Sequence, residues 1–96
     1  MRKVLGAVCL VLLLTGCGGV PGDNGFEKDW KALYPNANMT TAIPDAKAVC
    51  DSFKAGTKYQ DEVAYLSAKL KAADSDSRNM IATATVNYCP DYKNLH

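Results

Sequence analysis

The chain has 96 residues, with 11 lysines and arginines against 10 aspartates and glutamates, and its formal net charge is +1. Without Arg2 and Lys3, nine basic and ten acidic residues remain, so the charges nearly balance. This balance excludes the clustered basic face of a nucleic-acid-binding protein, and it leaves no polybasic patch for a membrane surface.

The chain begins with the features of an export signal. Arg2 and Lys3 precede an apolar stretch of 11 residues, 4–14. This length is typical of the apolar core of a signal peptide, whereas a membrane-spanning helix needs about 20 apolar residues. We therefore expect residues 1–16 to be a cleaved signal peptide.

The apolar stretch ends in Leu14-Thr15-Gly16-Cys17. These residues resemble the lipobox of bacterial lipoproteins, in which leucine and small residues precede the cysteine. The resemblance implies that the Cys17 thiol receives a diacylglyceryl group and that cleavage before Cys17 follows. An ordinary secreted protein cut nearby and an uncleaved signal anchor are the alternatives. The expected location is the cell membrane, lipid-anchored on its extracytoplasmic face.

Residues 17–25 join the lipidated cysteine to a glycine-rich segment without apolar periodicity. We expect a flexible linker there, with a root-mean-square reach of about 15 Å. One folded domain is expected over residues 26–96, close to the membrane and free to tumble.

The positions of the four cysteines predict different roles for them. If residues 1–16 are cleaved and Cys17 is lipidated, as the lipobox resemblance implies, Cys50 and Cys89 remain in an oxidising compartment, where one pairing is possible. A disulfide closing a loop of about 40 residues would stabilise the domain by about 4 kcal/mol. The alternative is two free buried thiols. A metal site is disfavoured, because two cysteines and His96 do not make a tetrahedral ligand set.

The first half of the domain shows two helical patterns. The first begins after a cap at Asp23 or Asn24 and stops at Pro35. The second begins at Thr40 or Thr41, or after Ile43 if Pro44 takes the first helical position, and ends at Gly56. The apolar positions recur at helical spacing: Phe26, Trp30, Leu33 and Tyr34 in the first helix, and Ile43, Ala46, Val49, Cys50 and Phe53 in the second.

The second half shows two more helical patterns. The third helix carries Tyr59, Val63, Leu66 and Leu70 on its apolar face, and its predicted outer face carries Asp61, Glu62, Lys69 and Lys71. The fourth helix begins at Asp74 or Ser75, presents Met80, Ile81, Ala84 and Tyr88, and ends at Cys89-Pro90. The predicted fold class is therefore all-α, a small bundle of three to four short helices cross-linked by one disulfide.

Three short motifs in the domain carry a family resemblance: Ala48-Val49-Cys50-Asp51, Gly56-Thr57, and Ala84-Thr85-Val86-Asn87-Tyr88-Cys89-Pro90. They are similar to the domain of unknown function 732 family, small exported actinobacterial proteins that are often lipoproteins. The resemblance covers Phe26 to Pro90 and implies a structural role for Cys50 and Cys89. It implies no catalytic residue, because the activity of the family is not known.

The side chains that enzymes need are scarce in this chain. His96 is the only histidine and lies at the last position, where chains usually fray. Asp61 and Glu62 are adjacent on a helix, so their side chains diverge by about 100° and do not form an acid–base pair. We therefore expect no enzyme activity, no catalytic residue, no metal and no cofactor.

The expected function is that of a membrane-anchored, surface-exposed lipoprotein acting as a non-enzymatic binding module. Its partners would be the membrane, through the lipid anchor, and a protein or another cell-envelope component; nucleic acid is not expected. Tyr65 and Tyr92, which lie off the predicted core positions, are candidates for an exposed binding patch. The alternative function is a phage- or prophage-encoded superinfection exclusion lipoprotein, based on size and anchor alone.

Overall fold

The computed structural model describes residues 22–95, which form four α-helices and one short 3-10 helix. In chain order these are α1 (Asp23–Leu33), α2 (Met39–Lys54), α3 (Tyr59–Leu70), α4 (Asp74–Tyr88) and η1 (Pro90–Tyr92). The described residues contain no strand. The all-α prediction is confirmed.

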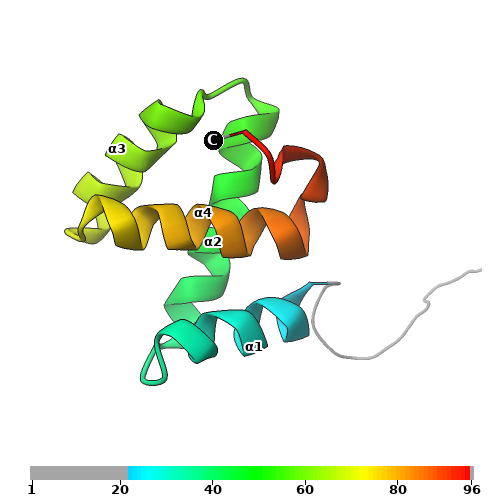
Figure 1. Cartoon of the computed structure of the whole chain (residues 1–96), viewed down its shortest axis with the longest axis vertical. Helices are drawn as coiled ribbons and strands as arrows, with labels where there is room; N and C mark the ends of the chain where they lie inside the picture. The colour runs from blue at the N-terminus through cyan, green and yellow to red at the C-terminus, as the bar shows by residue number, and fades with distance from the viewer. Residues whose placement is uncertain (1–21, 96) are drawn as a thin grey trace, which may run out of the picture.

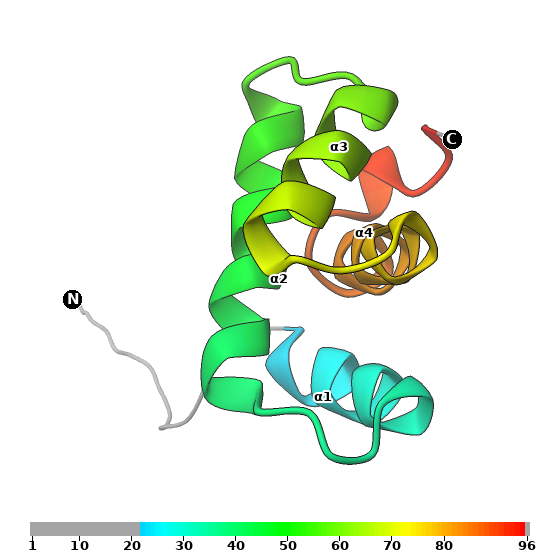
Figure 2. The same ribbon diagram turned by 90° about the vertical axis from the view of Figure 1, so that its left-hand side faces the viewer.

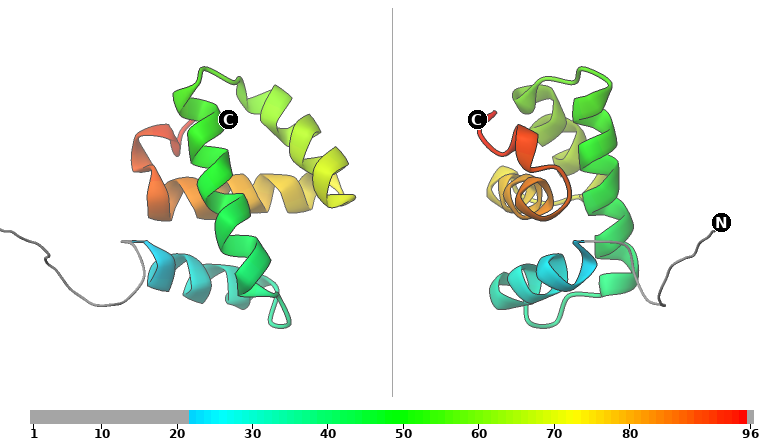
Figure 3. Two further views of the ribbon diagram at one scale, coloured as in Figure 1. Left: turned by 180° about the vertical axis from the view of Figure 1, so that it is seen from behind. Right: turned by 90° about the vertical axis from the view of Figure 1, so that its right-hand side faces the viewer.

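Helix α4 is the centre of the fold, because it packs against α1, α2 and α3 (Figure 1). Helices α1 and α4 lie side by side and run in opposite directions, and α2 crosses both of them (Figures 2 and 3). Helix α3 packs mainly on α4. The side chains shared by these interfaces form one core: Phe26, Trp30, Ala42, Ala46, Val49, Phe53, Val63, Leu66, Met80, Ile81 and Ala84.

The starts of α1 and α2 differ from the prediction. Gly22 occupies the N-cap of α1 without a side-chain cap, so Asp23 is already helical and α1 begins inside the segment expected to be linker. The cap of α2 is Asn38, whose side-chain oxygen accepts a hydrogen bond from the Thr40 backbone N–H at 2.9 Å. Pro44 lies inside α2 rather than at its first position. It is tolerated because the carbonyl that loses its partner belongs to the exposed Thr40 and can bond water.

The predicted end of α2 at Gly56 is confirmed. The Gly56 N–H donates to the Phe53 carbonyl at 3.0 Å, and the Thr57 N–H donates to the Ser52 carbonyl at 3.0 Å. These two bonds are those of a Schellman motif, which satisfies carbonyls at a helix end. The turn therefore redirects the chain into α3 after only a few residues.

Helix α4 begins at Asp74, one of the two predicted starts, and its N-cap residue makes no side-chain cap bond. Its N-cap is Ala73, and Asp74 is the first helical residue. The Asp74 carboxylate instead accepts a hydrogen bond from the Ser67 hydroxyl of α3 at 2.8 Å. An acidic residue in the first turn still favours the helix through its dipole.

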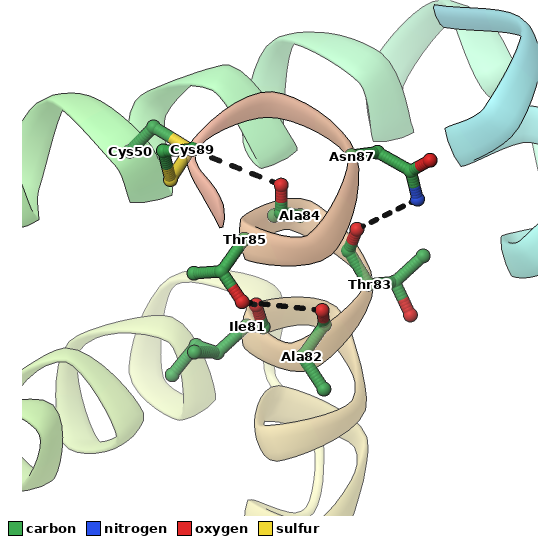
Figure 4. The surroundings of a disulfide bond; sticks show 8 residues. All are labelled: Cys50, Ile81, Ala82, Thr83, Ala84, Thr85, Asn87 and Cys89. Carbon is green, nitrogen blue, oxygen red and sulfur yellow. Dashed lines mark hydrogen bonds between the residues drawn. A yellow bond between two sulfur atoms is a disulfide. The ribbon is translucent and has the colours of Figure 1, made fainter. Parts of the chain in front are cut away.

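The disulfide joins Cys50 on α2 to Cys89 at the end of α4 (Figure 4). Their α-carbons are 5.9 Å apart, within the range that disulfides require. The predicted pairing of Cys50 with Cys89 is confirmed, and the bond lies where α2 crosses α4 (Figure 3). Near the bond, the Thr85 hydroxyl donates to the Ile81 carbonyl at 2.9 Å, so this buried polar group is satisfied within its own helix.

Candidate functional site: an apolar groove at the α1–α2 corner

An open groove of about 500 Å³ lies where α1 ends and the chain turns into α2. We call it the corner groove; its lining residues are Trp30, Leu33, Tyr34, Pro35, Asn36 and Ala37. All six lining residues lie within one short stretch, the end of α1 and the turn that follows it. Apart from Asn36, their side chains offer apolar or aromatic surface, which suits an apolar ligand group.

The floor of the groove is aromatic. Trp30 is 9 % exposed, and its ring centroid lies 4.4 Å from that of Tyr34. Phe26, one turn earlier on α1, lies behind Trp30 with its ring centroid at 5.9 Å. These rings recur at helical spacing, so α1 presents one aromatic face to the core and ends that face at the groove.

Two hydrogen bonds hold the Tyr34 ring in place. Its hydroxyl donates to the Asp76 carboxylate and accepts a bond from the Asn79 amide at 3.0 Å. Burial raises the pKa of the Tyr34 phenol; the Asn79 bond acts in the opposite direction, and the neighbouring Asp76 raises the pKa further. The phenol therefore stays protonated at neutral pH and remains a donor, so this wall of the groove is preformed.

The rim of the groove is also held by backbone bonds. The Ala37 N–H donates to the Tyr34 carbonyl at 3.0 Å, and the Asn38 cap follows immediately. On this rim Leu33 is 52 % exposed, although it was predicted to belong to the core face. Leu33 is thus an apolar side chain held at the surface beside a rigid aromatic pocket.

A second groove, of about 370 Å³, lies at the other end of α2. It combines segments far apart in the sequence: Phe53, Gly56, Thr57, Lys58, Tyr59, Tyr92 and Leu95. The Tyr92 ring packs on Phe53 with centroids 5.9 Å apart and lines this groove. Tyr65 is 55 % exposed but lines neither of these grooves.

The comparisons with known proteins give one match. The family model of a protein of unknown function, DUF732, matches residues 29–91, about two thirds of the chain. The protein belongs to the DUF732 family. No curated protein and no solved structure is significantly similar to it. The match includes Cys50, Cys89 and the corner groove, whereas Cys17 lies outside the matched residues.

The predicted position of Glu62 in this DUF732 domain is wrong. It was predicted on the solvated face of α3, but it is 2 % exposed. Burial raises the pKa of its carboxyl, while a hydrogen bond from Ser52 on α2 and the charge of Lys69 act in the opposite direction. The helical spacing did carry a signal, because Glu62 lies four residues before Leu66 on the apolar stripe.

The remaining predicted site residues fall into two groups. Cys50 and Cys89 are buried, at 4 % and 6 % exposure, as a structural cross-link. Cys17 and His96 lie outside the described residues.

Within residues 22–95, no cluster of three or more His, Cys, Asp or Glu side chains is suitable for a metal ion. No helix in that part of the chain is long and apolar enough to span a bilayer.

Proposed function

We propose that this DUF732 protein is a lipid-anchored interaction module on the extracytoplasmic face of the membrane, and that it binds through the corner groove. The occupant is an apolar side chain of a cell-envelope protein. The observation that carries the proposal is the half-exposed Leu33 beside a preformed aromatic pocket. The role is non-enzymatic binding, with the lipid on Cys17 supplying the location.

The size and lining of the groove support this role. Ligand sites are typically clefts of about 300–1,000 Å³ with mostly apolar linings and a few placed polar groups. The corner groove has about 500 Å³, with the Asn36 amide as its polar element. Tryptophan and tyrosine in well-packed pockets are also the side chains that contribute most to protein–protein binding.

The rigidity of the corner groove also supports the proposed binding role. Because the Tyr34 hydroxyl is bonded to Asp76 and Asn79, the pocket does not have to be ordered when a partner binds. A preformed site avoids the entropy loss that a mobile surface would suffer. The lipid anchor adds a second effect, since it confines the domain to the membrane surface where envelope proteins are concentrated.

The test is site-specific photocrosslinking in intact cells. A photoreactive phenylalanine analogue replaces Leu33, and a matched control carries it at Tyr65, which is similarly exposed but lies in neither groove. We expect a discrete crosslinked species at Leu33 and none at Tyr65. Adding Ala37→Glu, which places a charge in the groove, should abolish the Leu33 crosslink, and circular dichroism of this variant checks that the domain remains folded.

Identical crosslinking patterns at the two positions would contradict the proposal. So would a Leu33 crosslink that survives Ala37→Glu, because the contact would then not depend on the groove. Mass spectrometry of the crosslinked species identifies the partner, and the same crosslink with the purified partner and the lipidated protein confirms a direct contact.

A further inference from the structure

We infer that the end of the domain where α1 begins and α4 ends lies against the lipid headgroups, so that the corner groove points away from the bilayer. This tether end consists of Gly22, Asp23, Lys47, Asn87 and Tyr88. The inference rests on the acylation of Cys17 proposed above. It replaces free tumbling with a preferred orientation of the domain on the membrane.

The chain enters the domain at a closely packed point. A Cβ atom at Gly22 would lie 2.5 Å from the Asn87 carbonyl oxygen and 2.9 Å from the Tyr88 ring. Gly22 also has φ +102°, a conformation that other residues rarely adopt. Its backbone is therefore seated directly on the last turn of α4, and the tether leaves the domain from this place.

Three helices meet at the tether end. The Asp23 carboxylate on α1 accepts a hydrogen bond from the Tyr88 hydroxyl on α4, and the Lys47 ammonium on α2 lies 3.7 Å from the same carboxylate. The Lys47 ammonium also lies 5.9 Å from the centre of the Tyr88 ring. The point of attachment is thus rigidly coupled to the whole bundle, so restraining it restrains the domain.

The tether is short compared with the domain. Five Cα–Cα steps separate Cys17 from Gly22, which limits their separation to about 18 Å. The glycine-rich linker predicted from the sequence would span about 12 Å on average. Helix α1 rises about 15 Å between Asp23 and Leu33. The turn after α1 lies at the opposite end of this helix from Asp23 (Figure 1), and the corner groove is lined by the end of α1 and that turn.

The lengths of the tether and of α1 favour the orientation in which the tether end faces the bilayer. If the groove corner faced the bilayer, the tether would have to run back along α1 and approach its full extension. A nearly extended chain has few conformations, which is unfavourable for its entropy. With the tether end toward the lipid, the tether keeps most of its conformations.

The orientation can be measured with the lipidated full-length protein. It is reconstituted in phosphatidylglycerol–phosphatidylethanolamine vesicles that contain a lipid with a nitroxide on its headgroup, which quenches nearby fluorophores. A fluorescent amino acid is placed at one of three exposed positions: Asn24 at the tether end, Asn36 at the corner groove or Gln60 on α3. We expect quenching at Asn24 to be about twofold or more stronger than at the other two positions.

A lengthened tether is the matched control. Inserting about twelve glycine and serine residues after Gly19 roughly doubles the average reach, and the difference between positions should then disappear. Equal quenching at all three positions with the native tether, or the strongest quenching at Asn36, would overturn the orientation. A difference that persists with the long tether would overturn the argument from tether length.

Intact-mass analysis of the same sample separates this inference from the proposed function. An acylated Cys17 with equal quenching at the three positions refutes the orientation alone. A protein without acyl mass that does not float with the vesicles refutes the anchor, and the orientation fails with it.

Discussion

The Tyr88 hydroxyl donates a hydrogen bond to the Asp23 carboxylate and so joins the last residue of α4 to the first residue of α1. The other end of the same helix pair has an equivalent bond, from Tyr34, just after α1, to Asp76 in the first turn of α4. Two tyrosine–aspartate bonds therefore hold the antiparallel helices at both ends. One lies at the tether end and the other in the corner groove.

Removing either hydroxyl should destabilise the domain. Hydrogen bonds to charged groups contribute about 1.5–3 kcal/mol, and each kcal/mol moves the melting temperature of a domain this small by about 4–8 °C. We expect Tyr88→Phe and Tyr34→Phe each to lower the melting temperature measured by circular dichroism. The control is Tyr65→Phe at an exposed position, which should leave it unchanged. Equal melting temperatures for all four proteins would show that the two bonds do not stabilise the fold.

The effect of Gly25→Ala on the stability of the domain should change sign when Asn87 is replaced by alanine. A Cβ at Gly25 would lie 2.3 Å from the Asn87 side-chain oxygen, so Gly25→Ala must displace an amide that donates to Asp29 at 3.0 Å. We expect Gly25→Ala to destabilise the wild-type domain in urea unfolding. In an Asn87→Ala background the same change should stabilise it by up to about 1 kcal/mol, because alanine is the better helix former. The same sign in both backgrounds would refute close packing at Gly25.

Glu62 should make stability depend on pH under mildly acidic conditions. Its pKa is raised in the folded state, so between its unfolded value, about 4.3, and its folded value the native protein binds more protons. Its contribution to stability is therefore fully present below about pH 4.3 and is lost as the pH rises through the folded pKa.

Urea unfolding between pH 4 and 7 measures this contribution. Replacing the buried carboxyl by Glu62→Gln should flatten the fall in stability as the pH rises, and it should stabilise the domain at neutral pH. The exposed neighbour Asp61 provides the control, because Asp61→Asn should keep the wild-type slope. A slope in Glu62→Gln as steep as in the wild type would assign the effect to another group.

The Cys50–Cys89 disulfide should contribute a large share of the stability. Removing a native disulfide from a small exported domain typically costs about 2–5 kcal/mol, against the 5–15 kcal/mol that holds typical domains together. We expect the Cys50→Ala/Cys89→Ala double variant to melt more than about 10 °C lower than the wild type. Intact-mass spectrometry of the unreduced domain should give a mass about 2 Da below the reduced form. Two thiols that alkylate freely in the unreduced protein would contradict the bond.

Cys17 should decide where the protein is found. If Cys17 carries the lipid, Cys17→Ser removes the acylation site, and the protein should move from the membrane to the soluble or culture fraction. Metabolic labelling with a clickable fatty acid measures acylation directly, and only the wild type should be labelled. The double variant at Cys50 and Cys89 keeps Cys17 and should still be labelled, which controls for a general effect of losing cysteines. Equal labelling of wild type and Cys17→Ser would refute the anchor.

The sequence by itself determined the helices and the disulfide, because both depend on signals that are local or few in number. Apolar side chains at helical spacing marked all four helices, and Gly56 marked the end of α2. The pairing of Cys50 with Cys89 followed from having only two cysteines left in the domain.

The tertiary structure decided what depends on residues far apart in the chain. Glu62 is buried because α2 brings Ser52 against α3, and the Tyr88–Asp23 and Tyr34–Asp76 bonds exist because α1 lies antiparallel to α4. Helical spacing gives the face on which a side chain lies, but it does not say which helix covers that face or leaves it open. The corner groove therefore depends on the tertiary structure, because α4 holds Tyr34 in place through Asp76 and Asn79, whereas the preceding residue, Leu33, remains half-exposed.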